Sequence, residues 1–255
     1  MAGDEPVYTQ FGSDTQLRWW GEWLVYVYHF GGSFYEEGSN NRRVDLTTEA
    51  VITATEFFVQ KSMGDVTEKF APDAIELSSH FSFVNGNIAM VFGGHMGDWY
   101  SYDTIGLDWD IQVLPTSEFD SEMTGGEISA DAFGISIRSR HKEAAFEFLK
   151  LWAGELGAEI LYENGKIGAL KDMESIIDEL PESNQLDIHV DRVFDAIDLA
   201  IVLPKEKDFS KVLREMVMTE IYKLMYDGRG SETDVVKVLE DIENRVNQYY
   251  IGLYG

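Results

Sequence analysis

Aromatic side chains beside exposed backbone are the most informative chemical feature of this sequence. Residues 86–100 read GNIAMVFGGHMGDWY, which predicts a short buried strand, a double-glycine turn and the start of an aromatic-bearing helix. A second double glycine at 31–32 follows a cluster of three tryptophans, Trp19, Trp20 and Trp23. Strand ends with bare backbone are where α/β proteins commonly hold ligands. The two turns therefore predict a binding cleft rather than a catalytic centre.

The three tryptophans fall on different faces of a predicted helix. At helical spacing, Trp20 and Trp23 share a face with Leu24 and Val27, so core packing is expected for at least one of them. Trp19 lies off that face. An exposed indole near a glycine turn suits stacking on a sugar ring or another planar ligand.

Residues that could support catalysis or bind a metal lack the spacing that such chemistry requires. No pair among the five histidines has the spacing of a helical zinc site, and His95, beside Gly94, is the one in an informative position. It is either a ligand contact or a plain turn residue. Asp108 and Asp110 alternate along a predicted strand, but nothing marks two carboxylates facing across a cleft, as a glycosidase needs. The sequence also lacks a nucleophile elbow, a phosphate loop and a calcium loop.

The composition is that of a globular protein with a strongly acidic surface. The chain has 255 residues and a net charge of −26, which disfavours nucleic acid and anionic membranes as partners. The absence of cysteine excludes disulfides and thiol chemistry. No segment approaches the roughly 20 apolar residues of a transmembrane helix. The first residues do not resemble a signal peptide, so the protein is either cytoplasmic or separated here from a targeting segment.

The predicted elements that would position these residues are mostly helices. A helix capped by Ser13 or Asp14 ends at Gly31, and a second is capped by Thr47 or Thr48. Further helices are predicted near 77–84, after Ser139, up to Gly165, and over 172–180, 186–200, 208–226 and 232–250. Strands are predicted at 88–92, 109–114 and 128–137. The result is a helix-rich α/β chain with too few strands for a large sheet of its own.

Four stretches of the sequence, in order and spacing, match a known family. They are Phe30-Gly-Gly-Ser-Phe-Tyr-Glu-Glu-Gly38 with the helix ending Glu56-Phe57-Phe58; Phe81 with Asn85-Gly-Asn-Ile-Ala-Met-Val-Phe-Gly-Gly94; Trp109-Asp-Ile-Gln-Val-Leu-Pro115; and Phe133-Gly-Ile-Ser-Ile with Lys142-Glu-Ala-Ala-Phe-Glu-Phe-Leu-Lys150 and Glu163-Asn-Gly165. From Trp20 to about Asn247, the chain resembles the later part of the extracellular solute-binding proteins of ABC importers, in the maltodextrin-binding-like family.

The resemblance implies a type II periplasmic-binding-protein fold, with two α/β lobes that close on a ligand. It assigns 1–114 and 181–255 to the C-terminal lobe, and 115–180 to a crossover and part of the N-terminal lobe. The family's first hundred or so residues have no counterpart here. We therefore expect apolar surface in the middle stretch, including Ile128, Phe133, Ile135 and Phe148, to be buried by rearrangement, domain swapping or a homodimer.

The resemblance also implies a set of ligand contacts. They fall at the helix start near Trp19 and Trp20, in the turn after the buried strand, in the glycine loop and near the penultimate helix. The turn, loop and helix residues are Gly94, His95, Met96, Asp98, Trp99, Gly125, Gly126 and Phe209. The family often has Pro-Trp where this chain has His95-Met96, so Trp99 would take over the stacking role.

The function implied is capture of a sugar or oligosaccharide for import, without a cofactor, metal or catalysis. The protein would act outside the cytoplasm, periplasmic or lipid-anchored, and would deliver its ligand to ABC permease subunits. Two alternatives stay open at this point: a carbohydrate-active enzyme that uses the same aromatic residues, and a sensor or interaction module derived from a binding-protein lobe.

Overall fold

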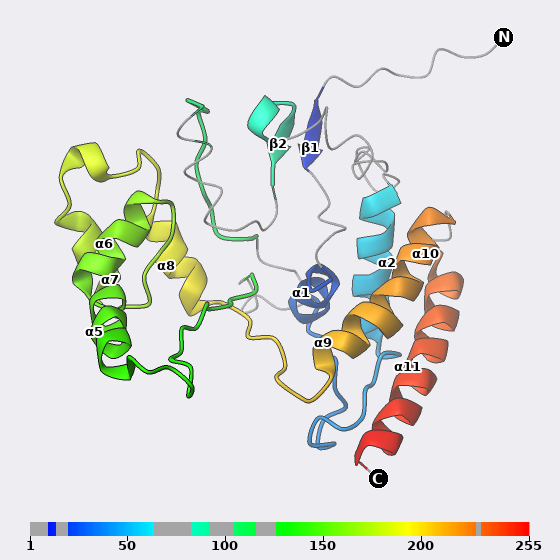
Figure 1. Cartoon of the computed structure of the whole chain (residues 1–255). Helices are drawn as coiled ribbons and strands as arrows, with labels where there is room; N and C mark the ends of the chain where they lie inside the picture. The colour runs from blue at the N-terminus through cyan, green and yellow to red at the C-terminus, as the bar shows by residue number, and fades with distance from the viewer. Residues whose placement is uncertain are drawn as a thin grey trace. The chain divides into compact units, whose positions relative to one another are not determined.

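The computed structural model describes residues 10–13, 20–63, 83–91, 102, 105–115, 126–227 and 231–254. The chain forms two compact units. Unit 1 comprises residues 1–93, 114–127 and 199–255, and unit 2 comprises residues 94–113 and 128–198. Figure 1 shows α1, α2 and α9–α11 in the first, and α5–α8 in the second. Within the described residues, no helix is both long and apolar enough to cross a bilayer.

The first helix of unit 1, α1, spans Glu22–His29 and ends at a glycine, as predicted. Gly31 is left-handed, with φ of 77°, and its N–H donates to the carbonyl of Tyr28 at 2.9 Å. The Gly32 N–H donates to Val27 O at 2.9 Å, which completes a Schellman motif. A Cβ on Gly32 would lie 3.0 Å from a Val27 methyl carbon, so the small residue lets the chain turn tightly against the helix.

The start of α1 differs from the prediction. Ser13 is the last residue of strand β1, Phe11–Ser13, and so does not cap a helix. The position before α1 is Gly21, whose side chain cannot supply a cap. The helix therefore begins later than its apolar spacing suggested, and residues 14–19, with Asp14 among them, lie outside the described residues.

The second helix, α2, spans Glu49–Met63, and Thr48 precedes it as predicted. The Val51 N–H donates to Thr48 Oγ1 at 3.4 Å. Val51 is fully buried, together with Ala54 and Phe58, whereas the neighbouring Phe57 is exposed. The Trp23 indole N–H donates to Thr55 Oγ1 at 2.9 Å, so a buried hydrogen bond fixes α1 against α2.

The connection between α1 and α2 is a polar turn. Tyr35 and Val44 form an antiparallel bridge, and Gly38 in the turn has a φ of 76°. The Asn247 side chain accepts from the Val44 N–H at 2.8 Å and donates to its carbonyl at 3.1 Å. An amide side chain thus pairs with backbone as a neighbouring strand would, and ties the turn to the last helix.

The remaining helices of unit 1 close its core. They are α9 (Phe209–Val212), the π-helix η4 (Leu213–Met218), α10 (Thr219–Tyr226) and α11 (Glu232–Tyr254). Figure 1 shows α2, α10 and α11 side by side, and these helices contact one another. The apolar residues of α11 recur at helical spacing, which predicts one inner face, and Val235, Leu239, Ile242 and Val246 are all fully buried. Ser231 caps α11, because its Oγ accepts from the Asp234 N–H at 3.4 Å.

Strand content is lower than predicted. After the 3-10 turn η1, Phe83–Asn85, strand β2 spans Ile88–Met90 and pairs in parallel with β1. The predicted strands 109–114 and 128–137 belong to no sheet among the described residues. An alternating sequence forms a strand only where a partner satisfies its backbone. Next to the second of these segments, the structure describes an isolated parallel bridge between Glu127 and Ile201.

Unit 2 is a small helical body. It contains α5 (Lys142–Trp152), α6 (Glu155–Glu163), α7 (Met173–Asp178), the 3-10 turn η3 (Glu182–Asn184) and α8 (Asp191–Asp198). Among its described residues, the core consists of Ala158, Tyr162, Met173, Ile177 and Val190. His141 occupies the position before α5 and makes no side-chain capping hydrogen bond. The predicted cap, Ser139, lies in the preceding turn, where its Oγ accepts from the His141 N–H at 3.2 Å.

The apolar residues that were expected to be covered in the middle stretch are not buried within this chain. Phe133 and Phe148 are exposed, and Ile128 and Ile135 are half-buried. Burial by a rearrangement of the chain itself is therefore wrong, whereas a domain swap or a homodimer stays a prediction.

The compact units divide the chain differently from the predicted lobes. Unit 2 comprises residues 94–113 and 128–198, whereas the predicted lobe boundaries fall at 114 and 180. The units are defined by contacts within this chain, so the lobe boundaries stay a prediction. Packing explains the later boundary, because Val190 is buried in the core of unit 2 and Phe194 packs against it. Which unit corresponds to which lobe stays a prediction.

Candidate functional site

Three of the predicted ligand contacts, Trp20, Gly126 and Phe209, lie among the described residues, all in unit 1. Trp20 is half-buried, and its ring meets that of Phe209 edge to face, with centroids 6.5 Å apart. Phe209 is 3% exposed and also meets the ring of Phe34 at 5.4 Å. In this structure Phe209 therefore supports Trp20 from the core, and Trp20 keeps part of its surface available.

Gly126 directly precedes the isolated bridge between Glu127 and Ile201 in unit 1. Its carbonyl accepts from the Ile201 N–H at 2.8 Å. A Cβ on Gly126 would meet only Leu114, at 3.9 Å, so the structure has room for a side chain at this position. Because Gly126 has no side chain, a ligand could approach the backbone closely at this position. That role in binding stays a prediction.

The other predicted contacts lie outside the described residues. They are Trp19, Gly94, His95, Met96, Asp98, Trp99 and Gly125. The double-glycine turn therefore stays a prediction. Strand β2, which leads to it, is described, and Ile88 in this strand is buried.

Two buried contacts hold the start of α1, which follows Trp20, against α2. The Trp23 side chain binds Thr55, and Lys61 of α2 lies 3.8 Å from the Glu22 carboxylate, between side chains that are about nine-tenths buried or more. Burial raises the pKa of Tyr222 to about 12, and the Glu22 charge contributes to the shift. A buried ion pair costs desolvation energy that its own attraction must offset, and this one links α1 to α2.

A polar network holds the segment that leads to Phe209. Tyr249 donates to Asp208 Oδ2 at 2.6 Å, and Asn41 donates to Glu206 Oε1 at 2.5 Å. Asp208 has a left-handed backbone, with φ of 64°, which is uncommon for a residue with a side chain. Backbone strain of this kind persists where surrounding contacts over-determine it. Sequence reasoning missed this network, because its members lie far apart in the chain and show no motif.

Buried tyrosines adjoin this network. The hydroxyls of Tyr35 and Tyr250 lie 3.2 Å apart. Burial raises the pKa of Tyr35, and its hydrogen bond to Tyr250 adds to the shift. Burial likewise raises the pKa of Tyr28 to about 12, with a contribution from Glu206. These hydroxyls stay neutral at physiological pH and act as hydrogen-bonding groups rather than as bases.

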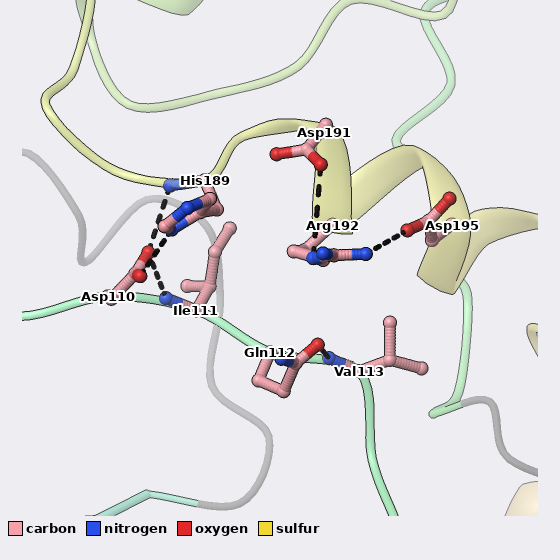
Figure 2. Close-up of polar contacts among 8 residues, drawn as sticks. All are labelled: Asp110, Ile111, Gln112, Val113, His189, Asp191, Arg192 and Asp195. Carbon is pink, nitrogen blue, oxygen red and sulfur yellow. Dashed lines mark hydrogen bonds and ion pairs between the residues drawn. The ribbon is translucent and has the colours of Figure 1, made fainter.

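Unit 2 has a shallow hollow of its own, of about 490 Å³, lined by residues 108–110 and 186–189. Figure 2 shows its central contact, in which the carboxylate of Asp110 meets His189. Asp110 accepts from the His189 N–H at 2.9 Å and lies 2.5 Å from its ring Nδ1. It also accepts from the Ile111 N–H at 2.8 Å. The backbone hydrogen bond from His189 is the main cause that lowers the pKa of Asp110.

The residues that line this hollow limit the reactions it could support. A glycosidase acid needs a carboxyl group whose pKa is raised, and the pKa of Asp110 is shifted the other way. In the part of the chain that the structure describes, no group of three or more acidic, histidine or cysteine side chains could hold a metal ion. The Asp110–His189 contact is therefore best understood as a tie between two segments of unit 2.

The architecture is that of a type II periplasmic binding protein. Among solved structures, the chain is similar to the ABC substrate-binding protein Lmo0181 from Listeria monocytogenes in complex with cycloalternan, with a TM-score of 0.66, 19% identity, and coverage of 94% of this chain and 59% of that one. It is also similar to the maltose/maltodextrin-binding domain MalE from Bdellovibrio bacteriovorus bound to maltotriose, with a TM-score of 0.68, 15% identity, and coverage of 95% and 61%.

A third similar structure is the maltose-maltodextrin binding protein of the thermoacidophilic bacterium Alicyclobacillus acidocaldarius, with a TM-score of 0.62, 14% identity, and coverage of 92% and 62%. This chain thus spans about three fifths of the length of these proteins. No family model matches the sequence, and no curated protein does. The fold class predicted from the sequence is confirmed.

Proposed function

We propose that this chain is part of the substrate-binding component of an ABC transporter and captures a sugar or oligosaccharide for import. The observation that carries the proposal is the fold, which is shared over 94% of the chain with a protein solved in complex with cycloalternan and over 95% with one bound to maltotriose. The four sequence stretches that resemble sugar-binding proteins support the same conclusion independently of the fold.

The proposed chemistry of binding is ring stacking combined with hydrogen bonds to hydroxyl groups. Trp20, backed by Phe209, presents an aromatic surface on which the apolar face of a sugar can pack. Trp19 and Trp99 would add further rings, while Asp98 and the backbone near Gly94 would bind hydroxyls. Ligand would stabilise a closed form of a two-lobed protein, which then docks on permease subunits. The proposed location is outside the cytoplasm, with no cofactor required.

Calorimetric titration with maltotriose and with cycloalternan tests this function. We expect saturable binding of at least one sugar by the wild-type chain. Trp20→Ala should weaken binding about tenfold, which corresponds to roughly 1.4 kcal/mol for the loss of one stacking surface. The matched control is Tyr226→Ala, because Tyr226 is an exposed ring at the end of α10 outside the proposed site.

Two outcomes would count against the proposal. If neither sugar binds, the proposed function of this chain is wrong. If sugar binds but Trp19→Ala, Trp20→Ala and Trp99→Ala all leave the affinity unchanged, the function stands and the site assignment is wrong. Turnover of a glycoside that is lost on one carboxylate substitution would instead favour the carbohydrate-active enzyme.

A further inference from the structure

Asp208 occupies an unusual junction, directly before the helix α9 that begins with Phe209. Its backbone is left-handed, with φ of 64° and ψ of 8°. Its carbonyl accepts from the Val212 N–H at 2.8 Å and so opens the helix. An aspartate in this position commonly caps the helix with its side chain, but Asp208 makes no such capping hydrogen bond.

The side chain of Asp208 binds another helix instead. Its Oδ2 accepts from the Tyr249 hydroxyl of α11 at 2.6 Å. The Lys211 ammonium lies 5.5 Å from the centre of the Tyr249 ring, which helps to hold that ring in place. Aspartate tolerates the left-handed region better than most residues, although glycine adopts it most readily. The contact with α11 therefore explains an aspartate at this junction, because it fixes the direction in which the chain enters α9.

The π-helix η4, which directly follows α9, acts on the rotation of Phe209 about the helix axis. A π-helix has hydrogen bonds from i to i+5, so each turn holds more residues than the 3.6 of an α-helix. The Thr219 hydroxyl donates to the Arg214 carbonyl, five residues earlier, at 3.3 Å and so satisfies a backbone acceptor of the widened turn. Such segments are rare and are frequent at functional sites.

The spacing of the buried residues shows what η4 achieves. Phe209 lies 12 positions before Ile221, and Val212 lies 12 positions before Leu224. All four side chains are buried in the core of unit 1. Twelve residues of a regular α-helix make about 3.3 turns, so the members of each pair would point roughly a third of a turn apart. The wider turns of η4 remove this difference and bring Phe209 to the face of α10 that is buried.

We propose that Asp208 and η4 are the positioning elements of the Trp20 stacking surface, and that sugar affinity depends on them through Phe209. This inference rests on the proposed function and extends it from the contact residue to the framework behind it. Asp208 and η4 do not touch the sugar in this account. They hold Phe209 edge to face against Trp20, and a surface held in place before binding loses less conformational entropy when a sugar packs on it.

Titration calorimetry with maltotriose on a series of Asp208 variants tests the first element. Asp208→Ala removes the acceptor and disfavours the left-handed backbone, so it should weaken binding about tenfold. Asp208→Asn keeps an acceptor and tolerates the same backbone, so it should restore most of the affinity. The matched control is Ser231→Ala, which removes a cap at the start of α11 and should lower stability without a change in sugar affinity.

A double variant separates positioning from a general loss of structure. If Asp208 acts through Trp20, adding Asp208→Ala to Trp20→Ala should weaken binding no further than Trp20→Ala alone. A further drop of about tenfold in the Trp20→Ala background would overturn the proposal, because it would show that Asp208 affects the affinity independently of Trp20.

Changes of length in η4 test the second element. Deletion of Glu215, an exposed residue, leaves 11 positions between Phe209 and Ile221. Eleven residues are close to three turns of a regular α-helix, so Phe209 should stay behind Trp20 and the affinity should stay within about threefold. Insertion of one alanine after Glu215 should turn Phe209 out of the core and weaken binding at least about tenfold. The reverse order of the two affinities would overturn the role of η4.

A readout without sugar keeps this inference distinct from the proposed function. The nuclear magnetic resonance signal of the Trp20 indole N–H, assigned by its loss in Trp20→Phe, should shift in Asp208→Ala and return in Asp208→Asn. If the wild type binds sugar and Asp208→Ala binds it as tightly, the function stands and the positioning role is wrong. If the wild type binds no sugar, the proposed function is wrong, and an indole signal unchanged in Asp208→Ala would overturn the positioning of Trp20 as well.

Discussion

The two units of this molecule bury apolar side chains to very different extents. Unit 1 encloses a continuous core of aromatic and aliphatic side chains, with Trp23, Phe34, Leu239 and Ile242 fully buried. In the part of unit 2 that the structure describes, five apolar residues form the buried core, and no residue of α5 is buried. Unit 1 therefore contains the packing needed to hold a site in place, whereas unit 2 leaves large apolar side chains of α5 and α6 exposed.

The largest predicted difference between the units concerns apolar truncation. Leu239→Ala in α11 removes a fully buried side chain and should destabilise unit 1 by about 2–5 kcal/mol. Leu151→Ala in α5 removes a half-exposed side chain and should change monomer stability by less than about 0.5 kcal/mol. Urea unfolding followed by circular dichroism measures both. Equal effects would contradict the contrast between the two units.

The buried ion pair of unit 1 should give a similarly large effect. Lys61→Met leaves the Glu22 carboxylate buried without its cation, which should cost about 3–5 kcal/mol. The double variant Lys61→Met with Glu22→Gln removes both charges and should recover most of that loss. Chemical unfolding at pH 7 provides the comparison. A double variant no more stable than Lys61→Met would show that the pair does not act as a unit.

A smaller effect is expected at the start of α11. Ser231→Ala removes the hydroxyl that accepts from the Asp234 N–H and should cost about 1 kcal/mol. Ser231→Asp retains an acceptor at the helix start and should be close to wild type. The free energy of unfolding from urea curves is the readout. Equal losses in the two variants would exclude a capping role.

The smallest effect should be the pH dependence of unit 2. Because the folded-state pKa of Asp110 is lowered, its contacts with His189 stabilise the fold above the unfolded-state pKa of roughly 3.9. That contribution is lost as the pH falls through the lower folded-state value. The pair is exposed, so less than about 1 kcal/mol is expected. Asp110→Asn should remove this loss of stability at acidic pH from the unfolding profile. An unchanged profile would show that the Asp110–His189 contact does not stabilise unit 2.

Sequence reasoning succeeded where one segment contains its own structural signal. The glycine that ends α1, the Thr48 position before α2 and the buried face of α11 could all be predicted from local spacing. It failed where a partner segment decides the outcome, as in 109–114 and 128–137, whose alternating residues join no described sheet. The Asn41–Glu206 and Lys61–Glu22 contacts could not be predicted either, because the paired residues are distant in sequence.

The predicted ligand contacts stay predictions, and the structure describes the surroundings of three of them, Trp20, Gly126 and Phe209. Trp20 was singled out from its position, and the structure places it half-buried against Phe209. The family resemblance implies that Phe209 is a ligand contact. In the structure Phe209 is buried, and its ring supports that of Trp20. The helical period that places Phe209 on the inner face with Val212 carried that information already.

Hydrogen exchange with and without maltotriose tests the central claim most directly, because it asks which unit responds to a sugar. The account predicts slower exchange at the start of α1 around Trp20 and in the segment that leads into α9, while α5 stays unchanged. The Trp20→Ala variant should lose this protection at the same sugar concentration. Hydrogen exchange that is the same with and without a saturating concentration of sugar would contradict the proposed site. Protection confined to unit 2 would contradict it as well.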